Sequence, residues 1–312
     1  MRALLVSNMQ ADAAHPARGS FVRDQFAALA ALPGVDVSLY EFPPGPRELA
    51  RAARALRRRY GGRERFDVVH AHFGLTAWPA LAVPARVRAL TMHGTDLADP
   101  RSRLATRAVL GLIDLPAAVS ASLAAQVPGR AARRTVVLPC GVDVERFHPI
   151  PRALARAELG LDAEAPLLVF PADPGRAEKR HDRAVAVASA AGAQLRALGA
   201  EPPERVPLWV NAADAVLVPS EREGFGLAVL EALACDVPVM ATPVGIHPEA
   251  LAGVQGTLCA PFEVEVWAAA VRRQLAADGP RVAGRARAGQ WSARAMAEAV
   301  LAAWRRVRDR SA

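Results

Sequence analysis

Short apolar runs alternate with alanine-rich segments of helical periodicity along the whole chain. In residues 21–32, for example, apolar side chains recur at every third or fourth position, as on the buried face of a helix. The apolar runs are short and rich in Val and Leu, which is typical of strands buried on both faces. In the first half of the chain they occupy residues 2–8, 35–42, 66–72, 87–94, 115–122 and 134–141. This alternation predicts an α/β fold with a parallel sheet between layers of helices.

The rhythm breaks around residues 139–161 and then begins again. Two prolines two positions apart, Pro149 and Pro151, suit a connection better than a strand. A second series of strand-like runs follows at residues 165–173, 193–199, 214–220 and 237–243. We therefore expect two doubly wound α/β domains, residues 1–145 and 146–290. A long amphipathic helix over residues 291–312 is expected to return to the first domain.

The composition favours a folded globular protein. Hydrophobic residues make up 52% of the 312 positions, and the mean hydropathy is +0.12, values outside the disordered class. The longest apolar runs fall short of the roughly 20 residues that a membrane-spanning helix needs, and the N-terminus lacks the pattern of a signal peptide. Cys140, Cys235 and Cys259 are widely spaced, which predicts free thiols and a cytoplasmic location.

Positive charge is supplied almost entirely by arginine. The net charge is +8, and Lys179 is the only lysine among the 39 Lys and Arg residues. Without zinc-finger spacing or an aromatic cluster, this charge does not indicate nucleic-acid binding. The densest basic stretch, Arg47–Arg65, has helical spacing with Leu49, Ala53, Leu56 and Tyr60 on one face. Two interpretations stay open: a surface helix that packs its apolar stripe on a sheet, or a helix that contacts anionic lipid headgroups.

Polar and glycine-rich segments follow several of the predicted strands. In parallel α/β sheets, ligands bind beyond the carboxyl ends of the strands, and two such domains predict a site in the cleft between them. Candidates are His93–Asp96, Glu221–Gly226 and the stretch that contains Lys179. The loop after the first strand ends in Arg18–Ser20, where Gly19 would let backbone N–H groups at a helix start approach a phosphate.

The segment EGFGLAVLE, residues 223–231, resembles the signature of the retaining glycosyltransferases of family 4, which have the two-domain, Rossmann-like GT-B architecture. It is preceded by AADAVLVPS and followed by ALACDVPVMATPVG. The segments RGSFVRDQ, HAHFG, HGTD and PCGVDVERFHP occur in the family's order, so the resemblance covers nearly the whole chain. It implies metal-independent transfer of a hexose-type sugar from a UDP- or GDP-linked donor to an acceptor hydroxyl, with no cofactor.

The resemblance also implies roles for the residues of this segment. Glu223, together with the backbone of Gly224, Phe225 and Gly226, would hold the transferred sugar. Glu231 would hold the ribose of the nucleotide. Charged carboxylates suit both tasks because they accept strong hydrogen bonds from hydroxyl groups.

On the same basis, Lys179 would stabilise the negative charge that develops on the leaving diphosphate. Its ammonium is a compact point charge, unlike the planar fork of an arginine. The family has a second basic residue six positions earlier, where this chain has Asp173, and Arg176 is the candidate replacement. His93 would contact the donor sugar and line the acceptor side, with Asp96 beside it.

Other interpretations stay open. A glycosidase would hold its two carboxyl groups about 5–9.5 Å apart, whereas eight residues of helix advance ~12 Å, which favours two contacts along an extended ligand. A catalytically silent nucleotide-sugar binder is favoured by Asp173, and a cofactor-dependent phosphorylase would use the lysine as a Schiff base. His70 and His72 would pack or line the cleft rather than bind a metal. The sequence has no Asp-x-Asp arrangement for a divalent cation.

Overall fold

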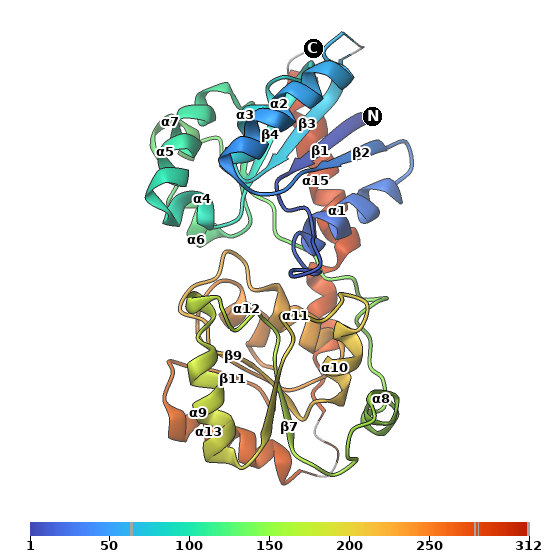
Figure 1. The fold of residues 1–312 in the computed structure, drawn as a ribbon, viewed down its shortest axis with the longest axis vertical. Helices are drawn as coiled ribbons and strands as arrows, with labels where there is room; N and C mark the ends of the chain where they lie inside the picture. Colours follow the sequence, from blue (N-terminus) through green and yellow to red (C-terminus); the bar gives the residue numbers. More distant parts are fainter. Residues whose placement is uncertain (63–64, 278, 280, 311–312) are drawn as a thin grey trace. The chain divides into compact units, whose positions relative to one another are not determined.

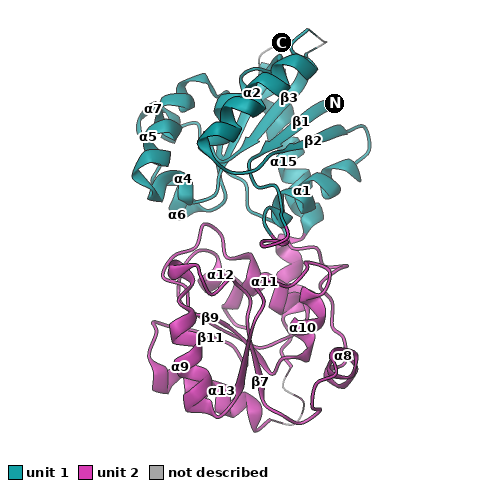
Figure 2. Cartoon of the chain, in the orientation of Figure 1, with its two compact units in different colours: residues 1–12, 18–141, 293–312 teal, residues 13–17, 142–292 magenta. Residues whose placement is uncertain are grey.

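The chain folds into two units, each built around one parallel sheet (Figures 1 and 2). The computed structural model describes the chain except for residues 63, 64, 278, 280, 311 and 312. Unit 1 comprises residues 1–12, 18–141 and 293–312, and unit 2 comprises residues 13–17 and 142–292. The prediction of two α/β domains with parallel sheets is confirmed.

The sheet of unit 1 has six strands in the order β2-β1-β3-β4-β5-β6, and every neighbouring pair is parallel. Its strands are β1 (Arg2–Ser7), β2 (Asp36–Glu41), β3 (Phe66–His72), β4 (Ala85–Met92), β5 (Leu115–Ala118) and β6 (Val136–Val137). The last strand is shorter than the apolar run that predicts it, because Pro139 has no N–H with which to extend the ladder.

Helices cover both faces of this sheet, which explains why β1 and β3 read as continuous apolar runs. On one face, Leu29 of α1 and Trp304 of α15 pack with Leu5 and Val68 of the sheet. The chain's last helix therefore returns to unit 1, as the sequence predicts. The helices and turns of this unit are α1 (Ser20–Ala30), α2 (Pro46–Tyr60), α3 (Gly74–Ala80), α4 (Thr95–Ala98), α5 (Pro100–Val109), η1 (Leu110–Leu112), α6 (Ala121–Ala124), α7 (Gly129–Ala132) and α15 (Ala293–Arg310).

The arginine-rich helix α2 packs on its own unit. Its apolar side chains Ala52, Leu56 and Tyr60 are buried, and the helix contacts α3. Its arginines lie on the exposed side. The apolar stripe is therefore buried, as expected for a surface helix, and the helix packs against α3. Residues 63 and 64 of the stretch lie outside the described residues. No helix in the described part of the chain is long and apolar enough to cross a membrane.

The sheet of unit 2 has five strands in the order β11-β10-β9-β7-β8, again with parallel neighbours. These strands are β7 (Leu167–Phe170), β8 (Gln194–Ala197), β9 (Ala215–Val218), β10 (Val239–Ala241) and β11 (Leu258–Cys259). The helices and turns of this unit are α8 (Arg152–Leu159), η2 (Ala177–Lys179), α9 (His181–Ala191), α10 (Val206–Ala212), α11 (Leu227–Ala234), α12 (His247–Leu251), α13 (Val264–Leu275), α14 (Arg285–Ala288) and η3 (Gly289–Trp291). Phe170 and Leu217 of the sheet pack against Val187 and Trp267 of α9 and α13.

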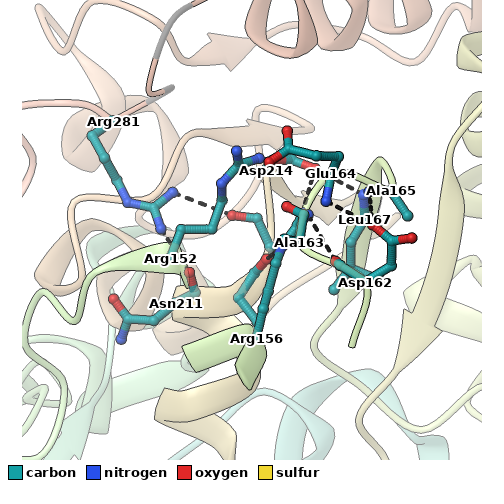
Figure 3. A network of polar contacts seen from close by, with 12 residues as sticks. Arg152, Arg156, Asp162, Ala163, Glu164, Ala165, Leu167, Asn211, Asp214 and Arg281 are labelled. Atoms are coloured by element: carbon teal, nitrogen blue, oxygen red, sulfur yellow. Dashed lines mark hydrogen bonds and ion pairs between the residues drawn. The ribbon is translucent and has the colours of Figure 1, made fainter. Parts of the chain in front are cut away.

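A buried ion-pair network lies at the amino ends of β7 and β9 (Figure 3). Asp214, directly before β9, accepts hydrogen bonds from the guanidinium of Arg156 at 2.9 Å and from the backbone N–H of Leu167 at 2.8 Å. It also pairs with Arg152. The side chain of Arg156 is 1% exposed and donates to the carbonyl of Ala212 at 2.9 Å. The network therefore joins α8, α10 and the two central strands.

Candidate functional site

Two loops of unit 2 bring Lys179 and Glu223 together beyond the carboxyl ends of β7 and β9. These two strands are neighbours in the sheet, so the segments that follow them leave the same edge. Lys179 is the last residue of η2, after β7, and Glu223 lies between β9 and α11. The N–H of Glu221 donates to the carbonyl of Glu178 at 2.9 Å. This hydrogen bond ties the two loops to each other.

The ammonium of Lys179 donates to both carboxylate oxygens of Glu223, each at 2.7 Å. The hydroxyl of Ser220 donates to one of these oxygens, also at 2.7 Å. The side chains are largely buried, with 16% of Lys179 and 8% of Glu223 exposed. Burial raises the pKa of Glu223, but the charge and hydrogen bonds of Lys179 outweigh it, so the pKa lies below its ordinary value. The carboxylate is therefore held ionised and oriented.

Glycine is required at two positions around the loop that carries Glu223 to α11, one in the loop itself and one after β10. Gly226 has φ +102°, and a Cβ at this position would lie 2.4 Å from Nε2 of His247. Gly245 has φ +58°, and a Cβ there would meet the carbonyl oxygen of Phe225 at 2.2 Å. Any larger residue would clash and adopt a strained backbone. The start of α11 consequently has no side-chain cap.

Two residues that the sequence interpretation did not single out also belong to this region. Ser220 lies three positions before Glu223, so its place in the loop was a signal that could have been followed. His247 is fully buried; it donates from Nδ1 to the carbonyl of Thr242 at 2.8 Å, and its Nε2 has no partner among the described residues. Burial lowers the pKa of His247, and the charge of Glu223 opposes this only partly. Nothing in the local sequence indicates that His247 lies near Glu223.

The guanidinium of Arg176 pairs with Glu178 at 2.8 Å, and the side chain of Arg176 is more than half exposed. Asp173 accepts a hydrogen bond from the N–H of Gly175 at 2.8 Å, as an aspartate at the start of a turn does. Glu231 lies half-buried on α11. The roles expected of Arg176 and Glu231 in donor binding stay predictions.

In unit 1, His93 follows β4 and is held by Asp96 of α4. The two carboxylate oxygens of Asp96 accept hydrogen bonds from the backbone N–H groups of Gly74, at 2.5 Å, and of His93, at 2.6 Å. Burial raises the pKa of Asp96, and these backbone hydrogen bonds lower it in part. Asp96 thus ties the loop of His93 to the start of α3. A direct contact of Asp96 with the donor stays a prediction.

Gly19 is the N-terminal cap of α1 and has φ +73°. A Cβ at this position would lie 2.4 Å from the carbonyl oxygen of Met9, in the loop after β1. A glycine is therefore needed for the chain to pass this close to its own loop. The role expected of Gly19 in phosphate binding stays a prediction.

His70 and His72 lie side by side on β3 and are fully buried. Their rings are stacked with centroids 5.0 Å apart, so they pack in the interior of unit 1. In the described part of the chain, no group of three His, Cys, Asp or Glu side chains is arranged to hold a metal ion.

Comparison with known proteins identifies the family. The model for glycosyl transferases group 1 matches residues 175–290, and the model for glycosyltransferase family 4 matches residues 10–146. A D-inositol 3-phosphate glycosyltransferase of Actinosynnema mirum is 32% identical over 307 residues, covering 78% of this chain and 73% of that protein. The chain belongs to the family 4 glycosyltransferases. The first match includes Lys179, Glu223 and Glu231, and the second includes Gly19 and His93.

This glycosyltransferase is also 32% identical to a D-inositol 3-phosphate glycosyltransferase of Segniliparus rotundus over 298 residues, covering 77% of this chain and 66% of that protein. The chain therefore spans about two thirds to three quarters of the length of these two relatives. Among solved structures, sucrose-phosphate synthase from Thermosynechococcus elongatus has a TM-score of 0.73 at 20% identity, covering 98% of both chains. Anabaena HepE in complex with UDP and glucose has a TM-score of 0.67 at 18% identity, covering 96% of this chain and 98% of that chain. Both similarities support the GT-B fold of this glycosyltransferase.

Proposed function

We propose that this enzyme moves a hexose-type sugar from a UDP- or GDP-linked donor to an acceptor hydroxyl, with retention at the anomeric carbon and without a metal ion. The observation that carries the proposal is the buried pair of Lys179 and Glu223 at the glycine-rich start of α11. The pair offers a cation for the leaving diphosphate and a carboxylate for sugar hydroxyls. The complex of HepE with UDP and glucose supports a donor of this class.

In the proposed reaction, the bond between the anomeric carbon and the phosphate oxygen breaks. A bond from the acceptor oxygen forms on the same face, and the acceptor's proton passes to the departing phosphate oxygen. No enzymic base is then needed. Lys179 stabilises the diphosphate as its negative charge grows, while Glu223 holds the sugar and Glu231 the ribose.

Residues of unit 1 act on the sugar and the acceptor in the same proposal. His93 contacts the transferred sugar, and Asp96 supports it by holding its backbone N–H. Gly19 leaves the start of α1 open to a phosphate oxygen. A cytoplasmic location, expected from the sequence, belongs to the same proposal.

The proposal is tested by incubating the protein with a panel of UDP- and GDP-sugars and measuring the release of free nucleoside diphosphate. One donor is expected to release it in the presence of EDTA as fast as in its absence, and NMR of the product is expected to show the donor's anomeric configuration. Donor binding in a thermal-shift assay without any release would favour the silent nucleotide-sugar binder instead. Loss of release in EDTA would contradict metal independence.

The acceptor is proposed from the names of the relatives. Proteins 32% identical to this chain are D-inositol 3-phosphate glycosyltransferases, so a phosphorylated polyol is the first acceptor to test. Mass spectrometry of reactions with D-inositol 3-phosphate, unphosphorylated inositol and no acceptor would detect the product. Equal product from both inositols would contradict recognition of the phosphate.

Helix α2 is proposed to give weak, peripheral contact with an anionic membrane surface. Because its apolar stripe is buried in unit 1, only its exposed arginines remain for such contact, and the binding is expected to depend on charge alone. Each arginine near an anionic surface contributes about 1 kcal/mol. Replacing Arg54, Arg57 and Arg58 by serine is therefore expected to weaken binding on the order of 100-fold.

Cosedimentation with vesicles that contain phosphatidylglycerol, and with neutral phosphatidylcholine vesicles, measures this binding. Added salt is expected to release the protein, because exposed charges are screened within about 10 Å at 0.1 M. The control replaces two exposed arginines of α15, Arg305 and Arg306, by serine. Equal binding to neutral vesicles, or equal losses in the α2 variant and the control, would contradict a role for α2.

A further inference from the structure

Three histidine rings of unit 1 form a row that the proposed reaction does not by itself explain. His70 and His72 are two positions apart on β3 and point to the same face of the sheet, as alternate residues of a strand do. The ring of His93, after the neighbouring strand β4, lies with its centroid 5.2 Å from that of His72 at an interplanar angle of 28°. Burial lowers the pKa of all three, that of His72 to about 3. The rings are therefore neutral near pH 7, each with one N–H donor and one acceptor nitrogen.

The first ring in the row has its proton position set by Trp304. The indole N–H of Trp304 can only donate, and it lies 3.2 Å from Nδ1 of His70. Nδ1 of His70 is thus the acceptor, and the proton of this ring is on Nε2. That N–H donates to the hydroxyl of Thr91 at 2.7 Å. His70 is consequently held in a single tautomer.

His72, the second ring, fixes the proton position of His93. The amide nitrogen of Gln25, on α1, lies 3.4 Å from Nε2 of His72. Because an amide nitrogen donates, Nε2 of His72 is the acceptor and its proton is on Nδ1. This N–H faces Nε2 of His93 at 3.0 Å, so Nε2 of His93 accepts. The proton of the neutral His93 ring is then on Nδ1.

Two aromatic rings also hold the ring of His93 in place. The rings of Phe21 and Phe73 lie with their centroids 4.8 Å and 4.7 Å from it. Phe73 has φ +74°, a backbone conformation that is strained for a non-glycine residue. Its N–H is held by the carbonyl of Thr91 at 3.0 Å. Strain of this kind persists where the surrounding structure requires the conformation, and here it places the aromatic wall of His93.

We propose that Gln25 and His72 are positioning residues that fix His93 as a neutral hydrogen-bond donor, so that its Nδ1–H points a proton at an oxygen of the sugar or acceptor. In this arrangement His93 has no free lone pair with which to take a proton from the acceptor. The inference rests on the proposed function in one respect, namely that His93 touches the substrate. It agrees with transfer of the acceptor's proton to the leaving phosphate.

The tautomers are measured directly by ¹⁵N NMR of the full-length protein labelled at histidine. His72 and His93 are expected to give the pattern of a neutral ring protonated at Nδ1, and His70 that of a ring protonated at Nε2. The variant Gln25→Met has nearly the same size and no donor, and it is expected to let His72 exchange between tautomers. Protonation of His93 at Nε2 in the unaltered protein would overturn the inference, whatever the activity.

Two substitutions of His72 separate positioning from packing. In His72→Asn, the amide nitrogen lies where Nδ1 lay and still donates to His93, whereas His72→Leu fills similar space without a donor. We expect kcat to fall on the order of 10- to 100-fold in His72→Leu, with KM for the donor changed much less, and to recover most of this loss in His72→Asn. If the leucine variant turns over as well as the asparagine variant, the hydrogen bond does not act.

Failure of the proposed function would look different. Full turnover in His93→Ala would remove His93 from the reaction while leaving the measured tautomers as they are. Circular dichroism and melting temperatures of the His72 variants show whether they fold. If neither does, the spectra of the unaltered protein and of Gln25→Met decide the inference.

Discussion

Replacement of Lys179 by alanine is expected to lower kcat about 100- to 1,000-fold, the cost of removing one preorganised charge from a developing negative charge. Lys179 is the only lysine of the chain, and its ammonium donates to both oxygens of the buried carboxylate of Glu223. In the proposed reaction this ammonium neutralises the leaving diphosphate. Steady-state release of nucleoside diphosphate measures the effect.

The controls separate charge from shape. Lys179→Arg keeps the charge but replaces a point donor by a planar fork, so it is expected to recover turnover only partly. Glu223→Gln keeps the size of the side chain and removes the charge, and it is expected to lower kcat by a similar factor. Turnover within about threefold of the unaltered enzyme in Lys179→Ala would contradict the role, because the expected loss is far larger.

A change in pH dependence should accompany the loss of Lys179. Burial raises the pKa of Glu223, and the ammonium more than offsets this. Without the ammonium, the pKa of Glu223 rises, so the carboxylate is protonated at a higher pH than before. The acidic limb of kcat/KM, which reports the free enzyme, is therefore expected to move to higher pH in Lys179→Met. An unchanged acidic limb would show that Glu223 does not control it.

Replacement of Arg156 by methionine is expected to lower the free energy of unfolding of unit 2 by about 3–5 kcal/mol, because it leaves a buried carboxylate without its buried partner. Asp214 is 1% exposed and would retain the backbone N–H of Leu167, the partly exposed Arg152 and the nearby charge of Arg281 (Figure 3). Urea unfolding followed by tryptophan fluorescence measures the change. The network lies at the amino ends of the strands, so kcat below the unfolding range should not change.

The matched control is Arg152→Met, which removes a partner of the same carboxylate. The side chain of Arg152 is 30% exposed, and a pair that is open to water contributes only about 0–1 kcal/mol. The double variant Arg156→Met/Asp214→Asn keeps an acceptor for Leu167 and removes the buried charge. It is expected to lose less stability than the sum of its two single variants. Additive losses would show that the two side chains do not act as a pair.

Much of the architecture could be predicted because it depends on short stretches of the chain. The runs 2–8 and 66–72 read as buried strands since both of their faces are covered by helices, and they form β1 and β3. The arginine-rich segment could also be predicted to form a helix. Which of its apolar residues are buried, beginning with Ala52, depends on the side of the helix that meets α3.

The candidate site was predictable only in part. Lys179 and Glu223 could be named from the motifs around them, but their mutual contact joins residues 44 positions apart. Gln25 could not be named from the sequence, because nothing near it on α1 indicates a role. In the structure it lies beside His72, which is 47 positions away on β3. His247 was missed for the same reason.

The alternation of strands and helices, the family and the residue types at the ends of the strands follow from apolar periodicity and from motifs a few residues long. The contacts of Lys179 with Glu223, of Asp214 with the arginines of α8, and of His72 with Gln25 and His93 arise only in the folded molecule. Hydrogen bonds and desolvation depend on distances of a few ångströms between atoms, and those distances exist only once parallel strands have brought distant segments to the same edge of a sheet.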